Sequence, residues 1–178
     1  SHVHLKRMQL SGTFQNFGLR GSNVSNFSME YCTFTGTFGT NAGFDEGVVS
    51  FAGLTGTALV RSSSLTGGLE DIIRIQNNSG NLDSLVIENS FIGLNSTSLG
   101  NDGILVQTLS NAIVKMRVSG TDFAGARGDC IQVNALGNSN VGVKIQNCDF
   151  TNAHPNIVTA GGGITLSGGA NMSNITYN

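Results

Sequence analysis

Apolar and polar residues alternate in short runs along the whole chain, and two kinds of run recur. The first is a six-residue run that ends in a large apolar residue, and its copies are Met29–Phe34, Val60–Leu65, Val118–Phe123 and Ile145–Phe150, with shorter versions at Leu10–Phe14 and Ile87–Phe91 that lack one residue. The second is a five-residue run with copies at Gly47–Phe51, Asp71–Ile75, Asp102–Val106, Asp129–Val133 and Gly162–Leu166. Alternation with a period of two predicts β-strands in both.

The runs repeat at a regular distance. From Phe34 to Phe150 the residues that close the first run are 31, 26, 32 and 27 positions apart, a mean of about 29. Self-similarity at a period of roughly 20 to 50 residues is typical of repeat architectures. A repeat with two or three short strands and no helix is too short for a propeller blade and lacks the consensus of a leucine-rich repeat. It predicts an all-β parallel β-helix of about six to seven coils, stacked at about 4.8 Å.

Stacked coils would place equivalent residues in columns along the solenoid. The expected internal columns are one that is mostly aromatic and one that is aliphatic: Phe14, Phe34, Leu65, Phe91, Phe123 and Phe150, and Val49, Ile73, Ile104, Ile131 and Ile164. The expected outward columns are Ser28, Leu59, Val86, Arg117, Lys144 and Asn174, and Glu30, Arg61, Glu88, Ser119, Gln146 and Thr176. Arg61 and Glu88 alternate in sign, which indicates a solvated face with weak cross-strand pairs.

Exposed aromatic rings of the kind that stack on sugars are not expected. The chain has no tryptophan, and Tyr31 and Tyr177 fall at inward or turn positions of the repeat. His4 and His154 have no partner in the pattern, and His154 stands beside Pro155 in an expected loop.

The run at Ile145–Phe150 and its relatives resemble the repeats of right-handed parallel β-helices of the pectate-lyase-like superfamily, over about residues 3–178. That scaffold carries lyases, hydrolases, phage tailspikes, autotransporter passengers and large adhesins, so the resemblance implies a fold and no single activity. A polygalacturonase-like site would need an Asp-Asp pair and a His-Gly, which are both missing, although Arg74-Ile75-Gln76 is similar to the family's Arg-Ile-Lys. A pectate-lyase-like site would need calcium-binding acids beside an arginine base. Arg127 lies two residues from Asp129, but the flanking motifs are absent.

Two columns of aspartates are the main candidates for chemistry: Asp71, Asp102 and Asp129 at the start of the second run, and Asp122 and Asp149 just before the end of the first. Neighbouring coils would bring successive carboxylates to about 5 Å. This spacing suits a glycosidase pair or a calcium site, and it also suits carboxylates that accept main-chain N–H groups in the turns. We expect turn capping, since the first column has inward parity and borders a glycine turn. The catalytic candidates are Asp102, Asp129, Arg127, Asp122 and Asp149, and the calcium candidates are Asp71, Asp102 and Asp129.

Composition narrows the range of partners. Charged residues make up 11% of the chain, the net charge is −2 and the basic residues are scattered, so no nucleic-acid-binding patch is expected. No apolar run approaches about 18 residues, so no membrane insertion through a helix is expected. The three cysteines cannot all pair, and Cys32 and Cys148 would lie four turns apart, which is too far for a disulfide. Cys130 and the other two are expected to be packing residues.

The chain is expected to be a single segment, residues 1–178, of a longer solenoid that is open at both ends. Residues 3–14 already belong to a coil, the run at 172–178 stops before its closing residue, and neither end carries an amphipathic cap. Ser1 and His2 are interpreted as a cloning remnant.

The sequence is compatible with three functions. The favoured hypothesis is a non-catalytic structural or binding segment of a large secreted or cell-surface, adhesin-like protein, which contacts carbohydrate or another cell-surface ligand and requires no cofactor. The alternative is part of a polysaccharide lyase or glycoside hydrolase, for which calcium would be the cofactor. The third is a segment of a phage tailspike-like fibre. The sequence leaves the oligomeric state open.

Overall fold

The computed structural model describes residues 2–40, 46–96, 98–151, 162–169 and 174–177, the last four by their backbone alone. Every regular element in this part of the chain is a strand, and the strands pair in parallel to form three sheets. The protein is therefore a parallel β-solenoid, as the sequence predicts. No helix in the described part is long and apolar enough to cross a membrane.

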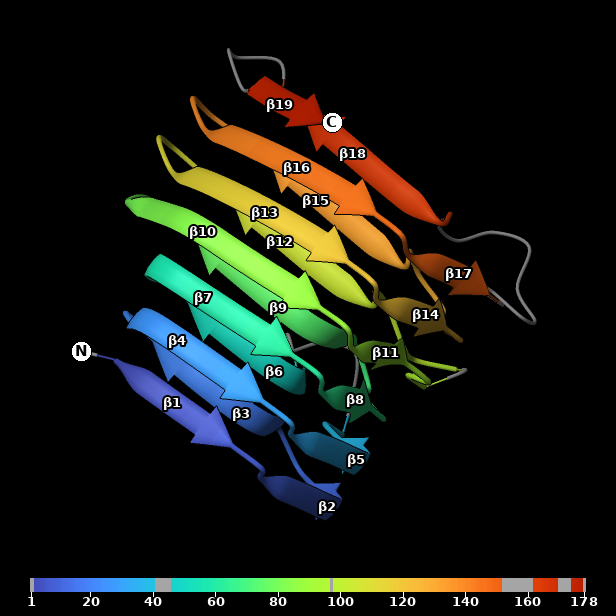
Figure 1. Ribbon diagram of the computed structural model, residues 1–178. Helices are drawn as coiled ribbons and strands as arrows, with labels where there is room; N and C mark the ends of the chain where they lie inside the picture. The colour runs from blue at the N-terminus through green and yellow to red at the C-terminus, as the bar shows by residue number, and fades with distance from the viewer. Residues whose placement is uncertain (1, 41–45, 97, 152–161, 170–173, 178) are drawn as a thin grey trace.

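The chain visits the three sheets in a fixed order and then starts again one level higher (Figure 1). Sheet A contains β1 (Val3–Lys6), β4 (Ser25–Glu30), β7 (Thr55–Arg61), β10 (Asn81–Glu88), β13 (Ile113–Ser119), β16 (Asn140–Gln146) and β19 (Asn174–Tyr177). Sheet B contains β2 (Gln9–Phe14), β5 (Thr33–Phe38), β8 (Ser64–Thr66), β11 (Phe91–Gly93), β14 (Asp122–Ala124) and β17 (Asp149–Thr151). Sheet C contains β3 (Phe17–Ser22), β6 (Gly47–Ala52), β9 (Asp71–Asn77), β12 (Ile104–Thr108), β15 (Ile131–Ala135) and β18 (Ile164–Gly168).

In Figure 1, the long strands of sheet A lie in front of those of sheet C, and the short strands of sheet B lie to one side. The solenoid makes about five turns, fewer than the six to seven coils expected. The six strands of sheet B and the six of sheet C are separated by five steps, whereas the expected number counted each copy of the runs as a full coil.

Three columns of apolar side chains, one from each sheet, run along the interior beside other buried residues such as Phe51, Ile75 and Val106. They are Leu5, Met29, Val60, Ile87, Val118 and Ile145 from sheet A, Leu10, Phe34, Leu65, Ile92, Phe123 and Phe150 from sheet B, and Leu19, Val49, Ile73, Ile104, Ile131 and Ile164 from sheet C. The register of the expected aliphatic column is thus confirmed, although Ile164 at its end is 43% exposed. Because every coil supplies one residue to each column, the core is continuous along the rod.

The expected aromatic column is wrong at two positions. Ile92, and not Phe91, pairs with Leu65 and Phe123, so Phe91 points outward between Ser64 and Asp122. Likewise Leu10 pairs with Phe34, while Phe14 lies one strand below Phe38 and stacks on its ring at 5.3 Å. The two runs that seemed one residue short are therefore complete, and they end at Leu10 and Ile92. The column requires only a large apolar side chain, and the shorter alignment arose because an aromatic ring was taken as the closing residue.

The expected register of the last strand is also wrong. Asn174 pairs with Asn140, and Thr176 pairs with Gly142, four residues before the positions expected for them beside Lys144 and Gln146. A shift by an even number of residues keeps every side chain on the same face of a strand. The alternation of polar and apolar residues therefore cannot distinguish these two registers.

The corner between sheets A and B has the same length in every coil. It always consists of two residues, and the first always has a left-handed backbone, with φ between 47° and 55° at Arg7, Tyr31, Ser62, Asn89, Gly120 and Asn147. Such a residue reverses the chain sharply and directs its side chain away from the core. This constant turn explains why the apolar residues before and after it are always five positions apart.

Candidate functional site

Asp71, Asp102 and Asp129 form a column of buried carboxylates at the start of the sheet C strands, with side chains that are 1%, 1% and 4% exposed. The main-chain N–H of Asp102 donates to Oδ1 of Asp71 at 3.0 Å, and the N–H of Asp129 donates to Oδ1 of Asp102 at 2.7 Å. The N–H of Gly162 donates to Oδ1 of Asp129 in the same way. Each carboxylate therefore caps the backbone of the next coil, which is the turn-capping role expected from the sequence.

Two residues that the sequence analysis missed complete this column. Arg74 donates from Nη1 to Oδ2 of Asp71 at 3.1 Å, and Asn101 donates from Nδ2 to Oδ1 of Asp71, also at 3.1 Å. Both Asp71 oxygens thus accept side-chain hydrogen bonds in addition to the N–H of Asp102. Asn101 immediately precedes Asp102 in the chain, and that neighbouring position was the only signal for its role.

Burial changes the protonation of the column. Burial, together with the nearby Asp71 carboxylate, raises the pKa of Asp102 to about 8. Burial also raises the pKa of Asp71, while the N–H of Asp102 and the Arg74 guanidinium oppose that rise. The pKa of the neighbouring Cys130 thiol is raised by burial to about 11, so the thiol stays protonated. A proton held by Asp102 at neutral pH removes one of the like charges that would repel each other in the column.

The other candidates do not join this column. Arg127 donates from its main-chain N–H to Oδ1 of Asn95 at 3.0 Å and from Nη1 to the carbonyl of Gly100 at 3.1 Å, and it makes no ion pair with the described residues. Its guanidinium is thus bound to the loop of the preceding coil and not to Asp129. Asp122 and Asp149 pair across β14 and β17 on the outer face of sheet B, where both are exposed. Within the described residues no group of three or more His, Cys, Asp or Glu could hold a metal ion.

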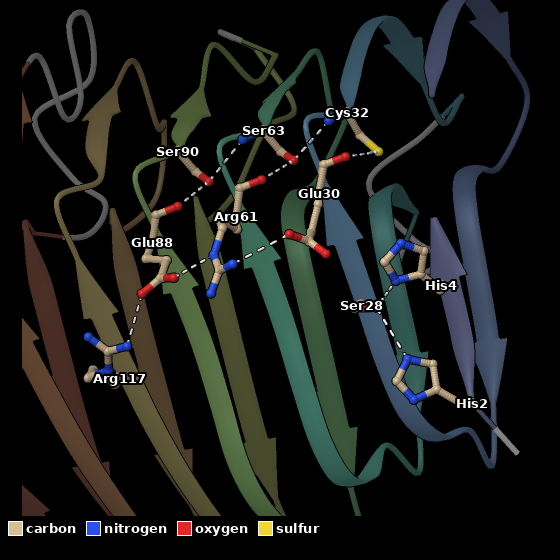
Figure 2. Close-up of polar contacts among 10 residues, drawn as sticks. All are labelled: His2, His4, Ser28, Glu30, Cys32, Arg61, Ser63, Glu88, Ser90 and Arg117. Carbon is tan, nitrogen blue, oxygen red and sulfur yellow. Dashed lines mark hydrogen bonds and ion pairs between the residues drawn. The ribbon is translucent and has the colours of Figure 1, made fainter. Parts of the chain in front are cut away.

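A row of alternating charges crosses the outer face of sheet A next to the A–B corner (Figure 2). Arg61 lies between Glu88, at 2.7 Å, and Glu30, at 3.5 Å, and Glu88 also contacts Arg117 at 2.9 Å. The pKa of Glu88 is lowered, first by its hydrogen bond from Arg61. The prediction of cross-strand pairs on this face is confirmed. His4, which had no expected partner, lies 2.6 Å from Ser28 Oγ through its Nδ1, and His154 lies outside the described residues.

Beside this row, the second residue of each A–B corner binds the backbone. Oγ of Ser63 donates to the carbonyl of Arg61, and Oγ of Ser90 donates to that of Glu88, each at 2.9 Å. The same two oxygens accept the N–H groups of Cys32 at 3.0 Å and of Ser63 at 3.2 Å, as Figure 2 shows. The hydroxyls therefore link neighbouring coils. Cys32 and Cys148 occupy this position four coils apart and are free thiols, as is Cys130.

A shallow groove follows the outer side of the same corner, with a volume of about 560 Å³. Its lining comes from four successive coils, and we call it the corner groove. Tyr31 and Phe91 supply aromatic rings to it, and Tyr31 is 51% exposed. The expectation that no aromatic ring is exposed is therefore wrong for Tyr31, whose left-handed turn position directs it outward. The side chain of Tyr177 lies outside the described part of the chain.

The polar lining of the corner groove includes Ser63 and Ser90, whose hydroxyls bind the backbone, and four side chains that are free. Thr33, Ser64, Asn89 and Asp122 line the groove, and none of these four side chains makes a hydrogen bond or ion pair to another described residue. Two aromatic surfaces thus lie beside free hydroxyl, amide and carboxylate groups. The constant five-residue spacing across the A–B turn marks this corner in the sequence, but it does not indicate which side chains are exposed there.

A scan of protein-family models, a search of curated proteins and a search of solved structures each find no match to the chain. Its assignment as a parallel β-helix repeat protein rests on the fold.

Proposed function

We propose that this chain is a non-catalytic structural and binding segment of a secreted or cell-surface, adhesin-like protein. The observation that supports this most is the role of the buried aspartates, whose Oδ1 atoms accept main-chain N–H groups from the next coil. Acids that are at most 4% exposed and bound in this way have no access to a polysaccharide. In the proposal these acids hold the rod together, and carbohydrate or another cell-surface ligand binds to its outer faces.

The absence of catalysis is testable with polysaccharides directly. Incubation of the protein with polygalacturonate, xylan and soluble cellulose, with and without calcium, is expected to release no reducing ends and no unsaturated uronic acids. Product formation by the purified chain would overturn the proposal of a non-catalytic segment.

Calcium gives a second test. Calorimetric titration with calcium is expected to give no binding heat, and a chelator is expected to leave the melting curve unchanged, because the Oδ1 atoms of Asp71, Asp102 and Asp129 already accept main-chain N–H groups. Binding at micromolar calcium that is lost in Asp102→Asn would instead favour a calcium-dependent lyase or a calcium-stiffened adhesin.

Glycoside hydrolysis is the second candidate, and the exposed pair Asp122 and Asp149 is the observation that favours it. These residues lie opposite each other on neighbouring strands, which are about 4.8 Å apart. Carboxyl groups about 5 to 5.5 Å apart are typical of retaining glycosidases. If product forms in the polysaccharide assay, this candidate predicts that Asp122→Asn and Asp149→Asn each abolish it, whereas the exposed Asp83→Asn on sheet A leaves it unchanged.

A further inference from the structure

We propose that the corner groove binds an extended, neutral β-linked oligosaccharide that runs along the axis of the solenoid. This inference rests on the proposed binding function and names its site and its class of ligand. It uses neither the buried aspartates nor the outer face of sheet C.

The first step of the argument is the combination of surfaces. A pyranose ring presents apolar C–H faces and a rim of hydroxyl groups. The Tyr31 and Phe91 rings can cover such faces, and the free groups of Thr33, Ser64 and Asn89 can donate to or accept from the rim. A purely apolar ligand would leave these polar groups without partners.

The second step is the geometry of the groove. Its lining residues belong to four coils that succeed one another at about 4.8 Å, so the groove repeats along the rod with that spacing. This repeat is close to the advance of one sugar residue in a β-linked glucan. A straight, extended chain of three or four sugars therefore matches the repeat, and a strongly coiled or branched glycan does not.

The third step is preorganisation. The main-chain N–H of Tyr31 donates to the carbonyl of Arg61 at 3.0 Å, and that of Phe91 donates to the carbonyl of Ser63 at 2.9 Å. Both rings are therefore carried by backbone that is hydrogen-bonded to a neighbouring coil. Binding groups on such rigid elements lose little conformational entropy when a ligand arrives.

The fourth step is charge. Asp122 lines the groove, and Asp149 is exposed on the next strand. The three arginine and glutamate side chains nearest the corner, Arg61, Glu30 and Glu88, are already paired with one another. The groove thus offers free negative charge to a ligand, which disfavours uronic acid polymers and other anionic glycans.

The test measures binding of cellotetraose by titration calorimetry or NMR. The parent protein is expected to bind it, and Tyr31→Asn is expected to weaken binding at least about tenfold, because the ring is lost while asparagine suits the left-handed backbone. Phe91→Ala is expected to weaken binding by a similar factor. Tyr31→Phe keeps the ring and should bind within about threefold of the parent.

Two controls make the result specific to the groove. Leu94→Ala removes an apolar side chain that is 57% exposed outside the groove, and it should leave the affinity unchanged. Tetragalacturonate, which is similar in size but anionic, should bind at least about tenfold more weakly than cellotetraose. Circular dichroism of each variant checks that it is folded.

The outcomes separate this inference from the proposed function. Absence of cellotetraose binding, equal binding by Tyr31→Asn and Phe91→Ala, or preference for tetragalacturonate would each overturn the inference about the groove. None of these results would make the chain an enzyme. Conversely, cleavage of cellotetraose during the titration would overturn the non-catalytic proposal, even if the groove were the binding site.

Discussion

Raising the pH from about 4 to about 8 is expected to lower the free energy of unfolding of this protein, and Asp102→Asn is expected to remove most of that loss. The pKa of Asp102 is about 8 in the folded chain and about 3.9 in an unfolded one. Between these values the folded state retains a proton that the unfolded state releases, so stability falls with increasing pH. The contribution of Asp102 to stability is therefore fully present below about pH 4 and is lost above about pH 8.

The size of this effect follows from the same two values. A difference of about four pKa units, at about 1.4 kcal/mol each, corresponds to a loss on the order of 5 kcal/mol across the window. Burial also raises the pKa of Asp71, which adds a loss of the same sign. In Asp102→Asn the amide oxygen can still accept the N–H of Asp129, but no proton is released, so the variant should exceed the parent in stability at pH 8.

Urea unfolding at a series of pH values measures this difference. Asp122→Asn is the matched control, because it removes an exposed aspartate from a neighbouring sheet and should leave the slope with pH unchanged. A slope that is the same in the parent and in Asp102→Asn would show that the buried column does not hold the proton.

Phe123→Ala is expected to destabilise the protein by about 3 to 5 kcal/mol, whereas Phe91→Ala should cost less than about 1 kcal/mol. Phe123 is 1% exposed, and its ring stacks on that of Phe150 at 4.9 Å in the sheet B column. Its truncation leaves a cavity that neighbouring coils cannot close. Phe91 stands on the outer side of the same sheet and is only partly buried, so its truncation opens no enclosed cavity in the core.

The shift of the urea midpoint for the two variants, at constant m-value, measures this contrast. The aromatic alignment of the sequence runs would place both rings in the core and predict similar losses. Similar large losses in both variants would therefore contradict the register of sheet B. The conservative change Ile92→Val, at the neighbouring core position, should cost about 0.5 to 1.5 kcal/mol.

The repeated runs were enough to predict the fold because solenoid coils are built from local patterns. Alternation predicts the strands, and the recurring aspartate with inward parity beside a glycine turn predicts the caps at Asp102 and Asp129. These features depend on residues a few positions apart. The core columns depend in addition on the register between coils. In sheet B the aromatic ring of Phe91 suggested a register that is wrong by one residue, because Ile92 occupies the column.

The candidate groove could not be predicted in the same way. The exposure of Tyr31 depends on a left-handed turn, which non-glycine residues adopt at five of the six corners and which leaves little trace in composition. Arg74 and Asn101 reach Asp71 from its own strand and from a loop on the next coil. The contact of Asn101 depends on the length of its loop, and this length differs from coil to coil.

The unequal corners of the solenoid have a consequence for how such a protein can change. The A–B corners are all two residues long, and the hydroxyls of Ser63 and Ser90 accept hydrogen bonds from main-chain N–H groups of the preceding corner. Among the corners between sheets B and C, residues 15–16, 67–70 and 94–103 differ widely in length, yet the strands on either side of them stay paired. The entropic cost of lengthening a loop grows only slowly. The B–C corner can therefore accept foreign peptides or accumulate insertions, while the A–B corner at the other end of the short sheet B strands keeps the spacing between coils constant.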